Sequence, residues 1–290
     1  MSGISSAVAV MFPVIAVVGR KNSGKTTLIE RLTSNLTRMG FRVATAKHVS
    51  IPNFSIDRKG TDTWRHGEAG ANPVICVSDV EICRIERGVF QNPLNRVLSL
   101  VPADIDLLLL EGFYRWIADN ENIAKIVCVR TAEEYEEYRS SCKNVLLFCS
   151  RKSLDGVSNI INIDEEFEPV VRKVIEYVEE FQAIKSVLEK LPRLNCKKCG
   201  RASCMEMARE IVKGTASFSD CVVLSEEPKV LLRVGNVNIP LQPFVMEIIR
   251  RTILGMISTL KGVKIRGDER IRLEVLSWEG EHEQREDEGI

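Results

Sequence analysis

Two short segments of this sequence combine residue types that could do chemistry. The first, GRKNSGKTT at 19–27, fits the pattern G-x-x-x-x-G-K-[ST], in which backbone N–H groups and a lysine bind phosphate oxygens and a hydroxyl ligates Mg²⁺. The second, LNCKKCGRASC at 194–204, places three thiols close together, and Cys221 follows. The first pattern predicts a triphosphate site, and the second predicts a metal site.

The elements around the glycine loop favour phosphate binding. The apolar run 13–19 is typical of a buried strand, and the segment after the loop has helical periodicity that ends at Gly40. A strand, a glycine loop and a helix N-terminus together direct N–H groups at a phosphate. We therefore expect nucleotide contacts from the loop and the first helical turn, namely Gly19, Asn22, Ser23, Gly24, Lys25, Thr26 and Thr27.

A carboxylate is expected beside this loop. The segment 104–113 is typical of an apolar strand that ends at Glu111 and Gly112, and parallel sheets bind ligands at the carboxyl ends of their strands. Glu111 would hold Mg²⁺ or orient an attacking water, while Lys25 reaches the β and γ phosphates and Thr26 ligates Mg²⁺. The alternative for Glu111 is a solvated acid at a strand end.

The wider pattern predicts an α/β fold. Apolar segments alternate with amphipathic ones, giving expected strands at 41–48, 71–78, 80–86, 104–113, 124–130 and 144–150 and expected helices at 92–102 and 131–139. Such alternation predicts a mostly parallel sheet with helices on both faces, the architecture of P-loop NTPases. A three- and four-residue apolar period over 165–191 predicts a long helix that stops before Pro192.

The polar segment 46–71 carries a family resemblance. Its Lys47-His48 pair, the stretch Phe54 to Asp57, the turn Gly60 to Thr63 and Ala69-Gly70-Ala71 resemble the molybdopterin-guanine dinucleotide biosynthesis protein B family, as does LLLLEGFYR. The resemblance covers 12 to about 165. It implies GTP and Mg²⁺ binding and an accessory role in attaching GMP to molybdopterin, beside a separate nucleotidyltransferase, for a molybdenum or tungsten cofactor. It also allows a homodimer.

Three further residues are candidates in this region. Asp57 is the loop acid best placed to approach Mg²⁺. His48 either contacts the ligand or is a hydrogen-bonded histidine at a strand end. Asp155, after the strand at 144–150, is a candidate acceptor for a guanine edge. The chain has no N-K-x-D motif, so the preference for GTP rests on the resemblance.

The thiol segment has the spacing C-x2-C-x4-C-x16-C, with a helical pattern after Cys204. Four thiolates suit tetrahedral zinc or a [4Fe-4S] cluster, and structural zinc sites favour two close C-x2-C pairs. The segment 190–223 resembles the four-cysteine iron–sulfur domain of corrinoid iron–sulfur proteins, which implies a [4Fe-4S] cluster on Cys196, Cys199, Cys204 and Cys221. Zinc is the alternative. The remaining cysteines, Cys76, Cys83, Cys128, Cys142 and Cys149, are expected to be small core residues.

The chain is expected to form successive parts: a P-loop GTP-binding domain at 12–165, a connecting helix at 166–191, a [4Fe-4S] domain at 192–223, a small α/β cap at 224–277 and a charged tail at 278–290. The cap is expected to contain a hairpin around Gly235-Asn236, a helix and a last strand. Forty basic and forty acidic residues balance, so no nucleic-acid partner is expected. No apolar run is long enough to cross a membrane, and clustered thiols without an export signal indicate the cytoplasm.

Together with the glycine loop, the family resemblance implies a GTP-binding accessory protein. Its hydrolysis is expected to be slow, since no arginine finger or catalytic glutamine can be assigned. One alternative is a nucleotide-driven electron-transfer protein, for which the cluster cysteines are expected inside the nucleotide domain. Another is an adapter that senses nucleotide without hydrolysing it and whose cluster is structural. Measured turnover separates the last alternative from the other two.

Overall fold

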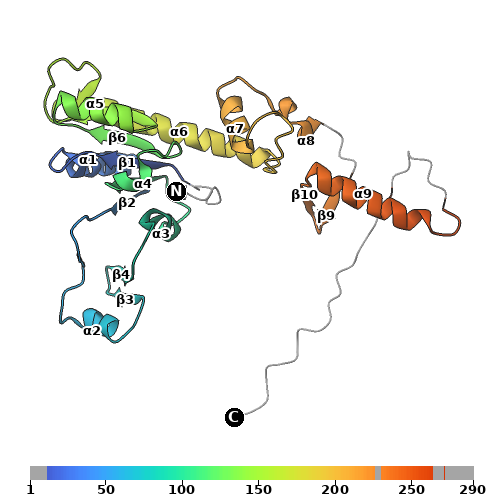
Figure 1. The fold of residues 1–290 in the computed structure, drawn as a ribbon, viewed down its shortest axis with the longest axis horizontal. Coiled ribbons are helices and arrows are strands. Elements are labelled where there is room, and N and C mark those ends of the chain that lie inside the picture. Colours follow the sequence, from blue (N-terminus) through green and yellow to red (C-terminus); the bar gives the residue numbers. More distant parts are fainter. Residues whose placement is uncertain (1–11, 226–229, 264–270, 272–290) are drawn as a thin grey trace, which may run out of the picture. The chain divides into compact units, whose positions relative to one another are not determined.

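The computed structural model describes residues 12–225, 230–263 and 271. They divide into two compact units, one ending at Ser186 and one starting at Val187 (Figure 1). Two expectations lie outside the described residues: the last strand of the cap and the charged tail.

The first unit is built on a parallel sheet. Its strands are β1 (Val14–Val18), β2 (Val43–Lys47), β5 (Leu107–Glu111), β6 (Ala124–Cys128), β7 (Val145–Ser150) and β8 (Ile160–Asn162). They lie in the order β2-β5-β1-β6-β7-β8, and every neighbouring pair is parallel. The expected mostly parallel sheet is confirmed. Strand β8 escapes sequence prediction because its three residues are too few for a periodic signal.

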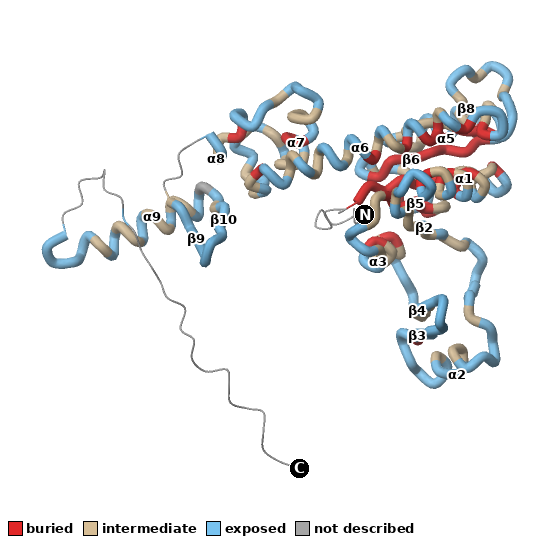
Figure 2. Tube along the Cα trace, turned by 180° about the vertical axis from the view of Figure 1, so that it is seen from behind, coloured by how far each residue is buried: buried red, intermediate tan, exposed pale blue. Residues whose placement is uncertain are grey.

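Helices cover both faces of this sheet, as expected. Ile15 and Val17 point to one face, where they pack with α1 (Lys25–Arg38) and the first half of α6 (Glu168–Lys190). Val14, Ala16 and Val18 point to the other face, where α3 (Pro93–Leu100), α4 (Tyr114–Ile117) and α5 (Ala132–Ser141) lie. The central strands are buried almost throughout, as the red trace in Figure 2 shows. This core fixes the strand ends that carry the candidate site.

The two strands predicted at 71–78 and 80–86 form, but not in the main sheet. Strands β3 (Val74–Val77) and β4 (Ile82–Ile85) pair antiparallel as a separate two-stranded sheet beside α2 (Asp62–Glu68). Cys76 lies opposite Cys83 in it and is exposed, so the expectation that Cys76 is a core residue is wrong. A two-stranded sheet has too little surface to bury both of its faces.

The other cysteines expected in the core differ in burial. Cys128 in β6 and Cys149 in β7 are fully buried, as expected, whereas Cys83 and Cys142 are only half-buried. Cys142 lies at the end of α5, where the helix leaves the sheet surface. Of these five thiols, only the two in strands of the main sheet are shielded from solvent.

A buried lysine holds the end of the sheet opposite the glycine loop. The ammonium of Lys125, near the start of β6, donates to the carbonyl oxygens of Asn120 and, at 2.6 Å, of Lys143. Its residue is fully buried, and burial lowers the pKa of Lys125 to about 8. The amine thereby ties two connecting loops to the sheet through their backbones.

The second unit contains short elements. These are α7 (Cys204–Val212), a 3-10 turn at Phe218–Asp220, α8 (Val222–Ser225), β9 (Leu232–Val234), β10 (Val237–Ile239) and α9 (Pro243–Ser258). The expected helix after Cys204 is confirmed, as are the hairpin around Gly235 and the helix that follows it. Within the described ranges, no helix has the length and apolarity needed to span a membrane.

Candidate functional site

The glycine loop joins β1 to α1 with a backbone that only glycine allows at two points. Gly19 has φ 147°, and a Cβ there would lie 2.2 Å from the carbonyl oxygen of Cys128 in the next strand. Gly24 has φ 93° and precedes α1, whose N-terminus receives no side-chain cap. The first-turn N–H groups of α1 are thus left for a ligand, which is the arrangement that binds phosphate.

Lys25 folds back on this loop. Its Nζ donates to the carbonyl oxygen of Arg20 at 2.6 Å, so the ammonium is held against the backbone of the loop. Partial burial lowers the pKa of Lys25, although the negative charge of Glu111 opposes that shift. A triphosphate would supply the negative charge that this partly desolvated cation lacks.

Glu111 is the centre of a three-residue cluster. The Thr26 hydroxyl donates to Glu111 Oε1 at 3.0 Å, and Lys47 Nζ donates to the same oxygen at 2.7 Å. The strand register explains the arrangement, because Glu111 pairs with Val17 on one side and with Lys47 on the other. The structure thus brings together two of the three predicted Mg²⁺ ligands, Thr26 and Glu111.

The third member, Lys47, was quoted from the sequence only as part of a motif. The signal that could have identified it is position: a lysine that ends one parallel strand beside a glutamate that ends its neighbour. With a carboxylate, a hydroxyl and two lysines, this edge combines cation ligands with cationic groups for phosphate.

His48 makes the contacts of the strand-end alternative. Its ring packs against Trp116 with centroids 4.8 Å apart and against Phe113 at 5.6 Å, and the backbone N–H of His48 donates to the Glu111 carbonyl oxygen at 3.0 Å. Ser50 Oγ lies 3.5 Å from its Nδ1. These contacts support the segment that follows Glu111.

Asp57 is engaged elsewhere. Its carboxylate accepts from Thr61 at 3.0 Å, from Thr63 at 2.9 Å and from Arg87 at 2.9 Å. Burial disfavours the charged form, but the hydrogen bonds of Thr63 and Thr61 and the charge of Arg87 outweigh it, so the pKa of Asp57 is lowered. None of these contacts involves Thr26, so a role for Asp57 at Mg²⁺ stays a prediction.

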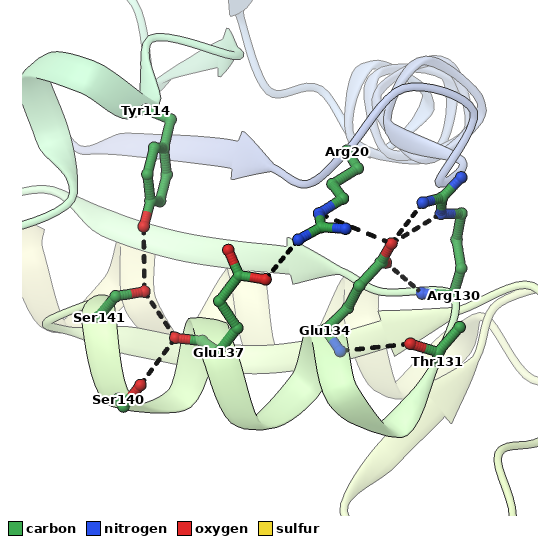
Figure 3. A network of polar contacts seen from close by, with 8 residues as sticks. All are labelled: Arg20, Tyr114, Arg130, Thr131, Glu134, Glu137, Ser140 and Ser141. Atoms are coloured by element: carbon green, nitrogen blue, oxygen red, sulfur yellow. Dashed lines mark hydrogen bonds and ion pairs between the residues drawn. The ribbon is translucent and has the colours of Figure 1, made fainter.

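An ionic network ties the glycine loop to α5 (Figure 3). Arg20 donates to Glu137 at 2.6 Å, and Arg130 donates to the buried carboxylate of Glu134 through its Nε at 2.9 Å. Arg130 also donates to the carbonyl oxygen of Lys21 at 3.4 Å. The sequence analysis missed this network, although Thr131 three residues before Glu134 is a helix-capping pattern that could have indicated it.

Two other predicted residues lie apart from these networks. Ser23 is buried, and its hydroxyl has no hydrogen-bond partner among the described residues. Asp155 is exposed in the loop after β7. The Ser23 hydroxyl, inside the loop, is therefore a polar group that a bound phosphate could satisfy.

The four predicted cysteines line one small cavity in the second unit. Cys196, Cys199, Cys204 and Cys221 surround it, with Met207 of α7 behind them. The loop curls around the thiols through left-handed residues: Arg193, Asn195, Lys197 and Gly200 all have positive φ. Non-glycine residues pay about 1–2 kcal/mol each for that conformation, so the tertiary structure must favour the curl.

Two side chains fix the curled segment. Asn195 Oδ1 accepts from the Cys204 N–H at 2.8 Å and joins the start of the loop to α7. Arg201 donates to Glu210 at 2.6 Å and to the Cys199 carbonyl oxygen at 3.3 Å. An all-sulfur donor set around one cavity fits the chemistry of an iron–sulfur cluster. In the described structure, however, no three His, Cys, Asp or Glu side chains are arranged to hold a single metal ion.

Comparisons with known proteins match two regions of this chain. The family described as "Molybdopterin guanine dinucleotide synthesis protein B" matches residues 14–151, and the family described as "Putative Fe-S cluster" matches 191–223. A crystal structure of a molybdopterin-guanine biosynthesis protein B is 28% identical, with a TM-score of 0.44, and covers 57% of this chain and 99% of that chain.

Two curated relatives are similar in sequence. The "Molybdopterin-guanine dinucleotide biosynthesis adapter protein" of Haemophilus influenzae is 35% identical over 108 residues, which is 35% of this chain and 57% of that protein. The "Putative molybdopterin-guanine dinucleotide biosynthesis adapter protein" of Methanocaldococcus jannaschii is 32% identical over 259 residues, covering 86% of this chain and 92% of that protein. With such coverage by a relative of this kind, the chain belongs to the molybdopterin-guanine dinucleotide biosynthesis adapter family.

Proposed function

We propose that this protein is a GTP-binding adapter that assists formation of the guanine dinucleotide form of molybdopterin, beside a separate nucleotidyltransferase. The proposal rests on one observation. Beside the glycine loop, the Thr26 hydroxyl and the Lys47 ammonium both donate to Oε1 of Glu111. A Mg²⁺-triphosphate needs a hydroxyl, a carboxylate and cationic groups at one place, and this edge of the sheet supplies them.

Each residue of the site has its own role in the proposed nucleotide binding. The N–H groups of the loop and of the first turn of α1 bind phosphate oxygens, and Lys25 turns from the Arg20 carbonyl to the β and γ phosphates. Thr26 and Glu111 would hold Mg²⁺, directly or through water. Lys47, whose side chain is more than half exposed beside Glu111, would face the terminal phosphate with its ammonium.

Hydrolysis is slow in this proposal. Two arginines at the phosphate site, Arg20 within the loop and Arg130 after β6, each form an ion pair with a glutamate of α5. An arginine that stabilises the transition state must reach the γ phosphate, so these ion pairs keep both side chains from that task.

A [4Fe-4S] cluster on Cys196, Cys199, Cys204 and Cys221 completes the proposal, supported by the shared cavity and by the family match to 191–223. When bound, the cluster would supply one-electron chemistry or rigidity to the segment. The chain's own contribution is the curled loop, which Asn195 and Arg201 hold in place.

The test is a nucleotide titration of the full chain with and without Mg²⁺. We expect GTP to bind more tightly with Mg²⁺ than without it, and turnover to be slow. Absence of triphosphate binding by the wild-type protein under both conditions would refute the proposal.

A further inference from the structure

The order of the strands indicates on which side of β1 the nucleoside of a bound triphosphate would lie. The Mg²⁺ and terminal-phosphate end lies at Glu111 and Lys47, on β5 and β2. The strand order places β6, β7 and β8 on the opposite side of β1. A triphosphate held by the glycine loop therefore directs its nucleoside toward the carboxyl ends of β6 to β8.

On that side, Arg151 lies close to the end of the loop. Arg151 follows β7, and its Cγ and Cδ would lie 3.0 Å and 3.1 Å from a Cβ placed on Gly24. The stem of Arg151 thus lies against the last glycine of the loop, immediately before α1. The absence of a side chain at Gly24 makes room for this contact.

The guanidinium group of Arg151 pairs with the carboxylate of Asp164. Arg151 Nε donates to Asp164 Oδ2 at 3.0 Å, and Asp164 follows β8. The backbone fixes both residues: Ser150 pairs with Asn162 across β7 and β8, and the Ile163 N–H donates to the Ser150 carbonyl oxygen at 2.9 Å. Their side chains are 56% and 39% exposed, so a ligand can reach both.

We propose that Asp164 recognises the guanine base and that Arg151 stacks on its face; this rests on the proposed GTP binding. Guanine presents two adjacent donors, N1–H and the N2 amino group, and a carboxylate has two acceptor oxygens to match them. Adenine presents an unprotonated N1, which a carboxylate repels. The planar guanidinium of Arg151 stacks on flat rings and, through its ion pair, orients Asp164.

The experiment measures the affinities of the full chain for GTP, ATP and xanthosine triphosphate. Xanthine carries a carbonyl where guanine has its N2 amino group, so the nearly isosteric change Asp164→Asn should favour it, with the amide N–H donating to that carbonyl. We expect Asp164→Asn to weaken GTP binding about 10- to 100-fold, as loss of charged hydrogen bonds does, and to strengthen xanthosine triphosphate binding. Asp155→Asn, at the exposed acid of the neighbouring loop, should keep the wild-type order.

Each outcome is decisive. An unchanged preference for GTP over xanthosine triphosphate in folded Asp164→Asn protein would overturn the inference, as would a switch produced by Asp155→Asn instead. Equal binding of GTP and ATP by the wild-type protein would also overturn it. If that binding still required Lys25, the proposed phosphate site would remain supported. Wild-type protein that binds none of the three triphosphates contradicts the proposed function itself.

Discussion

Lys47 and Glu111 form an ion pair of 2.7 Å across the neighbouring strands β2 and β5, at the edge where the glycine loop leaves β1. The side chain of Glu111 is only 14% exposed, whereas that of Lys47 is 55% exposed. The carboxylate is therefore held in place while its partner can move. Glu111 is oriented before any ligand arrives, which lowers the ordering cost of binding Mg²⁺.

Lys25→Ala should abolish tight triphosphate binding and leave the fold intact. The Lys25 ammonium donates to a loop carbonyl and contributes nothing to either core cluster. We expect GTP affinity to fall about 100-fold or more, because a charge-assisted contact to phosphate is lost. Isothermal titration and a thermal melt measure the two effects. Lys143→Ala, which removes an exposed lysine paired with Glu121, is the control, and equal losses in both variants would contradict the assignment.

Glu111→Gln should reduce hydrolysis far more than binding. The amide keeps the shape of the side chain but loses the charge that Mg²⁺ or an attacking water requires. We expect turnover to fall about 100-fold and GTP affinity to change less than about tenfold. Steady-state phosphate release and a binding titration provide the two numbers. Wild-type values for both would make Glu111 a strand-end acid and nothing more.

Asp57→Ala should loosen the segment between Asp57 and Arg87. The buried Asp57 carboxylate joins Thr61 and Thr63 to Arg87, and Arg87 loses its carboxylate partner in the variant. Faster amide hydrogen exchange across 57–87 is the expected result, with Asp62→Ala, at an exposed acid, as the control. A Mg²⁺ titration of GTP binding tests whether Asp57 is instead a Mg²⁺ ligand. If it is, the Asp57→Ala variant will need a higher Mg²⁺ concentration than the wild-type protein to bind GTP.

Cys199→Ser should lose the cluster and loosen residues 192–223 without loss of nucleotide binding. The curled loop has little apolar core of its own, so ligand binding and folding are coupled there. Anaerobically purified wild-type protein should be brown and hold about four irons per chain. Colourless protein with stoichiometric zinc would replace the iron–sulfur assignment by a zinc site. Loss of GTP binding in the variant would show that the two units depend on each other.

Thiol reactivity should follow burial in the sheet. Burial raises the pKa of Cys128 to about 12 and raises the pKa of Cys149 well above its usual value, so both stay protonated at pH 8. Cys76 is exposed in its hairpin and should be alkylated first. Iodoacetamide labelling followed by peptide mass spectrometry gives the order. Labelling of Cys128 before Cys76 in folded protein is the result that this structure does not allow.

The sequence predicted the parts of the fold that repeat a strong local signal. At 13–40, the apolar strand, the glycine motif and the amphipathic helix predict the same strand–loop–helix unit. The long helix before Pro192 was predicted because its apolar residues recur every three to four positions over many turns. Glu111 could be placed because a strand end beside a phosphate loop predicts a carboxylate, and the contact with Thr26 agrees.

Contacts between distant segments could not be predicted in the same way. The Lys47–Glu111 and Arg151–Asp164 pairs depend on which strands are neighbours, and alternation alone does not give the order β2-β5-β1-β6-β7-β8. The strands β3 and β4 were predicted, but it was not predicted that they form a sheet of their own. Their apolar residues resemble those of a core strand. Cys76 was misplaced for that reason.

The two ends of the main sheet should tolerate sequence drift differently. Lys125 is satisfied by the backbone carbonyls of Asn120 and Lys143, which any residue at those positions would supply. Selection therefore needs to keep the lysine but can let its partners vary. At the other end, the partner of Lys47 is the side chain of Glu111, so a change at either position removes the pair. Variation among relatives should accordingly accumulate around Lys125 and spare the edge beside the glycine loop.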